Sequence, residues 1–253
     1  MELSQFAIKS ALSSFWDGTE VLLYDEVEST NNLAKQELSA GGKYLIAAAA
    51  QTRGRGRRER SFYSPAGGLY FSLAFPWGKK ETPVLVTTMA AVATARVLER
   101  TFAIEIGIKW VNDLFYQGRK VCGILTEAIR EPESGQNISL VLGIGVNLLP
   151  PEEGFPEDIA EIAGAVTDGS LSINRNALIV DITNEIGEII SQLPARTYLE
   201  DYRKRCFIIG REVILDTGKH ILVEGISDNG SLLYFEGGKL QEISSGEISL
   251  KEY

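Results

Sequence analysis

The sequence predicts an α/β protein built on a mixed β-sheet with helices packed on one face, followed by a small C-terminal β-barrel. Helical and strand patterns alternate along most of the chain, as in a sheet covered by helices. Three strand-like segments follow one another between the long helices, which indicates a mixed sheet. From Phe207 onward, short strands alternate with glycine turns, which is typical of a small barrel.

The first part of the chain reads as helix, strand, helix and strand. A short amphipathic helix is expected within residues 3–15, and the apolar, β-branched run 21–27 is expected to be a strand. Ser29 then occupies the position of an N-cap for a helix over 31–38. The run 44–50 is apolar without alternation, so we expect a strand that is buried on both faces.

The middle of the chain contains one long helix and a series of short strands. Pro83 is expected at the first position of a helix ending near Phe102, because a missing N–H costs no hydrogen bond there. This helix has a wide apolar face rich in small residues, so it should pack against the sheet. Strands are expected at 68–76, 107–110, 114–116, 120–129 and 138–148, with a turn at 117–119 and a loop at 131–136.

The sequence pattern changes twice in the last third of the chain. Residues 150–169 are irregular, acidic and proline-bearing, so we expect a surface excursion. An amphipathic helix follows over 174–193, and a shorter helix over 197–206. Because helices give way to short strands at that point, we predict a boundary between a domain over 1–206 and a barrel over 207–253.

Composition narrows the possible functions. The chain has 253 residues, 44% of them hydrophobic, which is enough for a core of ordinary size. The net charge of −9 argues against a dedicated nucleic-acid binder. Two distant cysteines, Cys122 and Cys206, form no disulfide framework and fit a reducing compartment. There is no signal-peptide layout and no apolar run long enough to span a bilayer, so we expect a cytoplasmic protein.

A single histidine limits the chemistry. His220 lies late in the chain beside Gly218 and Lys219, which favours a surface turn over a catalytic role. A histidine metal cluster is therefore impossible, and we predict no metal-ligating residues. An enzyme of this composition has to act by positioning its substrates and controlling their charge.

The segment from Gln51 to Arg60 contains five arginines and two glycines in ten residues. It fits neither the helical nor the strand period, so we expect a loop. Glycines let the backbone approach a ligand closely, and arginine binds phosphate or carboxylate with a planar pair of N–H groups. The segment is therefore interpreted as an anion-binding loop, although a solvated run of charge would have the same composition.

Three further polar clusters are expected at strand ends, where open α/β sheets build their sites. They are Ser29-Thr30-Asn31, Lys109 to Asp113 together with Lys120, and Gly143 to Asn147. Each is weak alone, because the first could be a helix cap, the second a polar turn and the third a bulge. The combination of four clusters is what indicates a site.

The combined motifs resemble those of the biotin–protein ligase family over about residues 20–250. The glycine-arginine loop is matched by residues 54–60, and the lysine-tryptophan-proline-asparagine-aspartate motif by residues 109–113. The arginine-lysine-x-x-glycine-isoleucine-leucine strand is matched by residues 119–125, and the glycine-x-glycine-x-asparagine strand by residues 143–147. The end of the chain, residues 245–250, is similar to the end of the family's SH3-like barrel.

The resemblance implies an adenylate-forming enzyme. Such an enzyme activates biotin with ATP and Mg²⁺ to biotinyl-5'-AMP. It then transfers biotin to a lysine of a biotin carboxyl carrier domain, usually that of acetyl-CoA carboxylase. Biotin would be bound by Ser29, Thr30, Asn31, Gln51, Gly54, Arg55, Gly56, Arg57, Lys120, Gly123, Gly143 and Gly145. The nucleotide would be bound by Arg55, Arg57, Arg60, Lys109, Asn112, Lys120 and Asn147, and the catalytic residues would be Lys120, Arg57 and Asp113.

The chain departs from the family pattern at three positions. Val111 replaces a proline, Glu59 stands where glycine is usual, and Phe62 stands where tryptophan is common. Glu59 weakens the local positive charge and could raise the KM for ATP. The family's DNA-binding extension has no counterpart in the sequence, so we expect a ligase that does not bind DNA.

Two other functions remain open from the sequence. Lipoate ligases and octanoyl transferases are similar in fold and could share the lysine, although the arginine loop and the barrel favour biotin. A non-enzymatic RNA- or phosphate-binding module could also use an arginine loop, but the net charge and the lack of aromatic residues within the arginine run argue against it. A homodimer joined through sheet edges is possible by the same resemblance.

Overall fold

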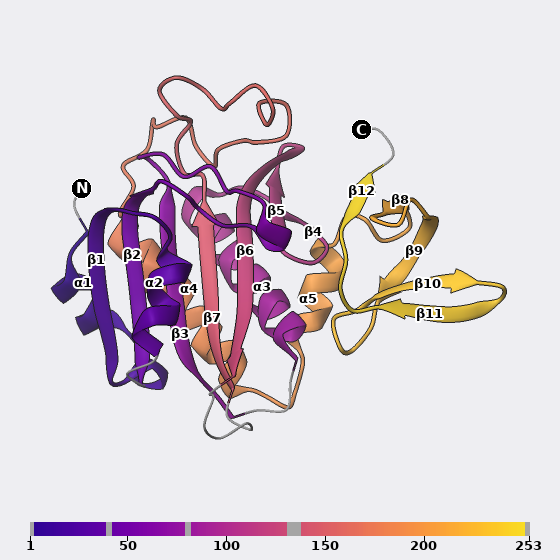
Figure 1. The fold of residues 1–253 in the computed structure, drawn as a ribbon, viewed down its shortest axis with the longest axis horizontal. Coiled ribbons are helices and arrows are strands. Elements are labelled where there is room, and N and C mark those ends of the chain that lie inside the picture. Colours follow the sequence, from indigo (N-terminus) through magenta and orange to yellow (C-terminus); the bar gives the residue numbers. More distant parts are fainter. Residues whose placement is uncertain (1–2, 39–41, 79–81, 131–137, 251–253) are drawn as a thin grey trace.

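The computed structural model describes residues 3–38, 42–78, 82–130 and 138–250. Within them, seven strands form one sheet in the order β1-β2-β3-β7-β6-β5-β4 (Figure 1). β1 and β2 pair in parallel and the other neighbours are antiparallel, which confirms the predicted mixed sheet. The strands are β1 (Thr19–Val27), β2 (Lys43–Gln51), β3 (Leu69–Trp77), β4 (Gly107–Lys109), β5 (Asp113–Tyr116), β6 (Arg119–Arg130) and β7 (Ile138–Val146).

The helices begin close to the predicted positions. They are α1 (Gln5–Ala11), α2 (Thr30–Glu37), α3 (Pro83–Phe102), α4 (Arg175–Ser191) and α5 (Tyr198–Arg205), with short 3-10 turns η1 (Ser14–Trp16) and η3 (Arg57–Glu59). Ser29 is the N-cap of α2, and its hydroxyl accepts from the N–H of Asn32 at 3.4 Å. Pro83 stands at the start of α3 as expected. The predicted loop over 131–136 lies outside the described residues.

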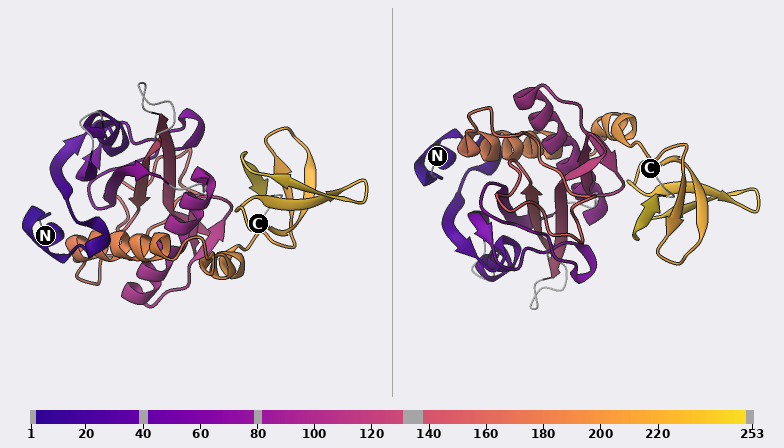
Figure 2. Two further views of the ribbon diagram at one scale, coloured as in Figure 1. Left: turned by 90° about the horizontal axis from the view of Figure 1, so that it is seen from below. Right: turned by 90° about the horizontal axis from the view of Figure 1, so that it is seen from above.

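The prediction that the helices share one face of the sheet is wrong. Leu45 and Ala47 of β2 pack in the core formed with α3 and α4, whereas Tyr44 and Ile46 pack on Ala34 of α2. Alternate residues of a strand point to opposite faces, so α2 covers the face opposite to α3 and α4 (Figure 2). A second covering helix also explains why the run 44–50 is apolar on both faces.

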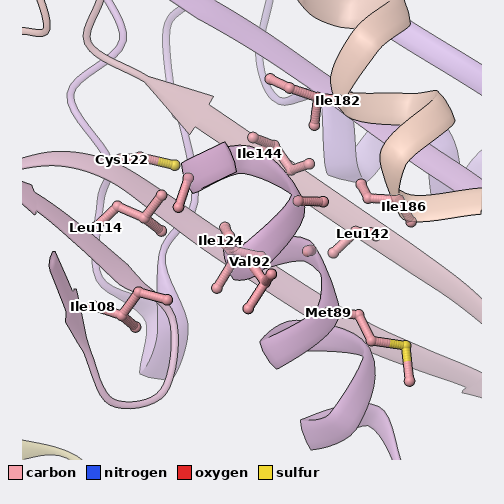
Figure 3. Packing of buried hydrophobic residues seen from close by; sticks show 14 of the residues in the cluster. Met89, Val92, Ile108, Leu114, Cys122, Ile124, Leu142, Ile144, Ile182 and Ile186 are labelled. Carbon is pink, nitrogen blue, oxygen red and sulfur yellow. The ribbon is translucent and has the colours of Figure 1, made fainter. Parts of the chain in front are cut away.

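The larger core lies between the sheet, α3 and α4. Val92 of α3 lies beside Ile124 of β6, and Met89 of α3 with Ile182 and Ile186 of α4 belongs to the same buried cluster (Figure 3). Small side chains along α3 let this helix lie close to the strands. The core thereby fixes the strand ends from which the polar clusters project.

The C-terminal strands form a separate antiparallel sheet in the order β11-β10-β9-β8-β12. They are β8 (Glu212–Leu215), β9 (His220–Ile226), β10 (Leu232–Glu236), β11 (Lys239–Ile243) and β12 (Ile248–Leu250). The indole N–H of Trp110 donates to the carbonyl of Gly230 at 2.9 Å, which ties this sheet to the first. Among the described residues, no helix is long and apolar enough to cross a membrane.

Candidate functional site

Strand register brings the predicted clusters to one edge of the large sheet. Val27, just before the Ser29 cluster, pairs with Gln51, where the arginine loop begins. Val146, just before Asn147, pairs with Cys122, and Gly123 pairs with Asp113. All four clusters therefore lie at neighbouring strand ends, where the long connections 52–68 and 147–174 also gather (Figure 1).

A small cavity of about 20 Å³ lies among the Ser29 cluster and the glycine strand. The backbone N–H and the hydroxyl of Thr30 lie 2.9 and 3.1 Å from Oε1 of Gln51. A Cβ atom at Gly143 would lie 2.0 Å from Oδ1 of Asn31, so this position must be glycine for the amide to fit. The cavity is lined by Ser29, Thr30, Asn31, Gln51, Arg55, Phe62, Gly123, Leu125, Gly143, Ile144 and Gly145.

A larger cavity of about 380 Å³ adjoins the first, and Phe62 is among the residues that line both. Nζ of Lys120 is 2.7 Å from Oδ1 of Asp113, whose carboxylate also accepts from Nδ2 of Asn112 at 3.0 Å. Burial lowers the pKa of Lys109, although the nearby Asp113 opposes the shift. The predicted residues lining this cavity are Arg55, Gly56, Arg57, Arg60, Lys109, Asn112, Asp113, Lys120, Gly123 and Asn147.

Phe62 lines both cavities, as do Arg55, Gly123 and Leu125. Its ring lies so close to the sheet that a Cβ atom at Gly145 would be 2.6 Å from it, and one at Gly123 would be 3.0 Å from it. Nζ of Lys120 lies 6.0 Å from the ring centroid. A ligand that reaches from one cavity to the other must therefore displace Phe62 or pass beside it.

The loop arginines point in different directions. Nη1 of Arg57 donates to Oδ1 of Asn112 at 3.3 Å, and burial lowers the pKa of this guanidinium. Nη1 of Arg55 donates to Oδ1 of Asn32 at 3.1 Å. Gly54 is buried within the loop. Arg58 and Arg60 instead form ion pairs with Asp216 and Glu247 of the C-terminal region.

Asn147 makes a contact that the sequence did not reveal. It lines the larger cavity, but its Nδ2 donates to the carbonyl of Gly164 at 3.0 Å, and its side chain is nearly buried. Residues 150–169 were expected to be only a surface excursion, but they also form part of the site. The N–H of Lys120 donates to Ile162 at 2.7 Å, and Phe155 and Ile159 form an apolar wall of the cavity.

Sequence reasoning missed two partners of Asn31 beside the small cavity, the buried Ser72 and the half-buried Glu127. Ser72 of β3 is fully buried, and its Oγ lies 2.6 Å from Oδ1 of Asn31. Oε2 of Glu127 accepts from Nδ2 of Asn31 at 3.1 Å. Nothing in a single sequence marks either residue as part of a site. Ser72 is a lone serine in an apolar strand, and Glu127 lies beyond the recognised motif. Among the described residues, no three His, Cys, Asp or Glu side chains are grouped to hold a metal.

The fold and the site define an α/β protein with a small polar cavity beside a larger one lined by cationic side chains. A model of the "Biotin/lipoate A/B protein ligase family" matches residues 23–147, and one of the "Biotin protein ligase C terminal domain" matches residues 208–251. The biotin–[acetyl-CoA-carboxylase] ligase of Paracoccus denitrificans is 30% identical, with 87% of this chain and 96% of that protein covered. The chain therefore belongs to the biotin/lipoate A/B protein ligase family.

Other relatives agree with this assignment. The bifunctional ligase/repressor BirA of Escherichia coli is 30% identical over 93% of this chain and 75% of its own length. A solved structure of the biotin protein ligase from Aquifex aeolicus, in complex with biotin and ATP, is 26% identical with a TM-score of 0.74. The match covers 92% of this chain and 99% of the Aquifex aeolicus chain.

Proposed function

We propose that this chain is an ATP-dependent biotin–protein ligase, which forms biotinyl-5'-AMP and transfers biotin to a lysine of a biotin carboxyl carrier domain. The main observation behind this proposal is the pair of adjoining cavities, one lined by amides and hydroxyls and the other by cations, which share Phe62 as a lining residue. Biotin presents a polar ring at one end and a carboxylate at the other. The first end suits the small cavity, and the second would reach Lys120.

The first step needs charge control more than proton transfer. The biotin carboxylate is already ionised at pH 7 and has to approach the α-phosphate, another anion. Lys120 and Arg57, which face the larger cavity, would offset this repulsion. Mg²⁺ would enter as the counter-ion of the ATP phosphates. The apolar wall of Phe155 and Ile159 would suit the adenine base.

The second step needs a neutral lysine on the carrier. Presenting a free lysine as its amine at pH 7 costs roughly 4.6 kcal/mol. Asp113 lines the cavity and remains our candidate to orient that amine, while its ion pair at 2.7 Å also holds Lys120. Arg55 and the glycines of the loop would close over the adenylate and exclude water.

The domain bounds, the carrier and the oligomeric state in this proposal are those that the family resemblance implies. We place the catalytic domain over 1–206 and an SH3-like barrel over 207–253, for which the second sheet gives support. The carrier would be that of acetyl-CoA carboxylase, and the enzyme could dimerise through a sheet edge. Cys122 and Cys206 are both free and buried, which fits the reducing cytoplasm.

Labelled biotin with ATP tests the proposal directly. We expect release of pyrophosphate that depends on biotin. We expect labelled protein only when a purified biotin carrier domain is added. Lipoate and octanoate serve as competitors, and neither should reduce labelling at equal concentration. Preferential use of lipoate, or no pyrophosphate release with any of the three acids, would overturn the assignment.

A further inference from the structure

Tyr202 of α5 is a fully buried side chain that the chemistry described so far does not use. Its hydroxyl donates to the carbonyl oxygen of Val111 at 3.1 Å. Burial raises the pKa of this phenol well above its usual value, so the hydroxyl stays protonated and acts as a donor. A hydroxyl without a partner would be costly in the apolar core, and the carbonyl of Val111 provides that partner.

Val111 is the central residue of the turn between β4 and β5, which begins at Lys109 and ends at its strand partner Asp113. Three residues of this turn line the larger cavity with polar side chains, namely Lys109, Asn112 and Asp113. Val111 is instead buried, and Tyr202 belongs to the apolar core. Tyr202 therefore contacts the turn from the core, behind the side chains that line the cavity.

Two side chains of this turn hold cations at the cavity. Oδ1 of Asp113 is 2.7 Å from Nζ of Lys120, and Oδ1 of Asn112 accepts from Nη1 of Arg57 at 3.3 Å. Nδ2 of Asn112 also donates to Oδ1 of Asp113 at 3.0 Å, which links the two side chains to each other. A shift of the turn would therefore displace both Lys120 and Arg57.

The helix that carries Tyr202 is itself anchored. Nε of Arg96 in α3 donates to Oδ2 of Asp201 at 2.8 Å. Directly after the helix, the N–H of Phe207 donates to the carbonyl of Ile108 in β4 at 3.3 Å. The helix is thus tied both to α3 and to the strand that leads into the turn, so a donor on it can hold the turn in a fixed position.

We infer that Tyr202 is a positioning residue for adenylate formation, which acts through the carbonyl of Val111 on the turn that holds Lys120 and Arg57. This inference rests on the proposed function, in which these two cations offset the repulsion between the biotin carboxylate and the α-phosphate. Valine at position 111 increases the importance of the contact, because it leaves free a φ angle that proline would fix. The tyrosine hydroxyl then restrains the turn in place of a proline ring.

The variant Tyr202→Phe removes the hydroxyl and keeps the ring. Its matched control is Tyr198→Phe in the same helix, where the buried hydroxyl donates to the carbonyl of Leu85 in α3 at 3.3 Å. Both variants lose a buried hydroxyl, but only the first loses a contact with the turn. The kcat for biotin-dependent pyrophosphate release should fall about tenfold in Tyr202→Phe and stay unchanged in Tyr198→Phe.

Ligand binding separates this role from a general loss of structure. The alcohol analogue of biotin lacks the carboxylate, and the residues that line the small cavity include none from the turn. Its Kd should therefore be the same in wild type and in both variants, with circular dichroism confirming that each is folded. An unchanged kcat in Tyr202→Phe, or an equal fall in both variants, would overturn the inference.

Rescue by proline tests whether Tyr202 acts through Val111. In the double variant Val111→Pro/Tyr202→Phe, the proline ring should restrain the turn and recover most of the lost kcat. A loss of kcat that proline does not recover would mean that Tyr202 acts by another route, and would also overturn the inference. A wild-type protein without biotin-dependent pyrophosphate release would instead overturn the proposed function.

Discussion

Lys120 lines the larger cavity and is held there by several contacts. Asp113 pairs with its ammonium group at 2.7 Å, and the ring of Phe62 lies 6.0 Å from Nζ. Its backbone is fixed as well, because its N–H and C=O bond to Ile162 and Gly164. The ammonium group is therefore oriented before any ligand arrives, which is what electrostatic catalysis requires.

Replacing Lys120 with alanine should abolish most adenylate formation without unfolding the protein. The loss of one oriented charge of this kind costs about 10²–10³ in kcat. Pyrophosphate release measures the effect, and circular dichroism checks the fold. Lys9→Ala, at an exposed position of α1, is the matched control and should retain full activity. Near-normal pyrophosphate release by Lys120→Ala would contradict the assignment.

The two buried cysteines make the free energy of unfolding depend on pH in the alkaline range. Burial raises the pKa of Cys206 to about 12 and raises that of Cys122 further. An unfolded thiol ionises near pH 8.5, so the folded state loses relative stability as pH rises above that value. Below it, both states are protonated and the thiols contribute no pH dependence.

We expect the free energy of unfolding to fall between pH 8.5 and 9.5 by about 2 kcal/mol, from two thiols that are half ionised in the unfolded chain at the lower pH. Urea titrations at both pH values measure this slope. In a Cys122→Ala/Cys206→Ala variant the slope should be much smaller, even if the variant is less stable overall. An identical slope in both proteins would show that the thiols are not responsible.

At the scale of elements, two ion pairs attach the second half of the arginine loop to the C-terminal sheet. Arg58 pairs with Asp216 beside β8, and Arg60 pairs with Glu247 just before β12. Partly exposed ion pairs of this kind contribute about 0–1 kcal/mol each. The ion pairs to the C-terminal sheet are therefore weak, and we expect the loop to open for ligand exchange.

Trypsin should reveal this opening, because the loop offers several arginines. Cleavage within residues 53–62 should be fast in the free protein and markedly slower with biotin and ATP bound. The double variant Asp216→Asn/Glu247→Gln should be cleaved a few-fold faster than wild type without ligand. Equal cleavage with and without ligands would rule out a loop that closes over the adenylate.

Elements with regular patterns could be predicted from the sequence, and the irregular segments of the site could not. Pro83 and Ser29 mark helix starts by local chemistry, and the glycines and arginines of the loop carry their own backbone and charge requirements. The wall formed by residues 150–169 has no period, and its position depends on long-range bonds such as that from Asn147 to Gly164. The placement of α2 was missed because the pattern of a helix shows which side of the helix is buried, and does not show which face of the sheet it covers.

At the scale of the molecule, the two sheets are joined by buried contacts. Val213 and Val223 of the C-terminal sheet belong to the same continuous core as the residues under α3 and α4. Nε of Arg203 in α5 donates to the carbonyl of Ile226 in β9 at 2.8 Å. The boundary predicted at residue 206 therefore falls inside a shared core.

This arrangement predicts that the chain unfolds in a single cooperative step. A shared apolar core makes it costly to detach the small sheet, because Trp110 would lose its buried hydrogen bond to Gly230. Tryptophan fluorescence and far-ultraviolet circular dichroism should therefore give coincident urea transitions. Trp110→Phe keeps most of the apolar contact but removes the N–H, so both probes should shift together by about 1–3 kcal/mol. An early transition seen by only one probe would mean that the C-terminal sheet is an independent unit, and that the arginine loop can lose its attachment while the rest stays folded.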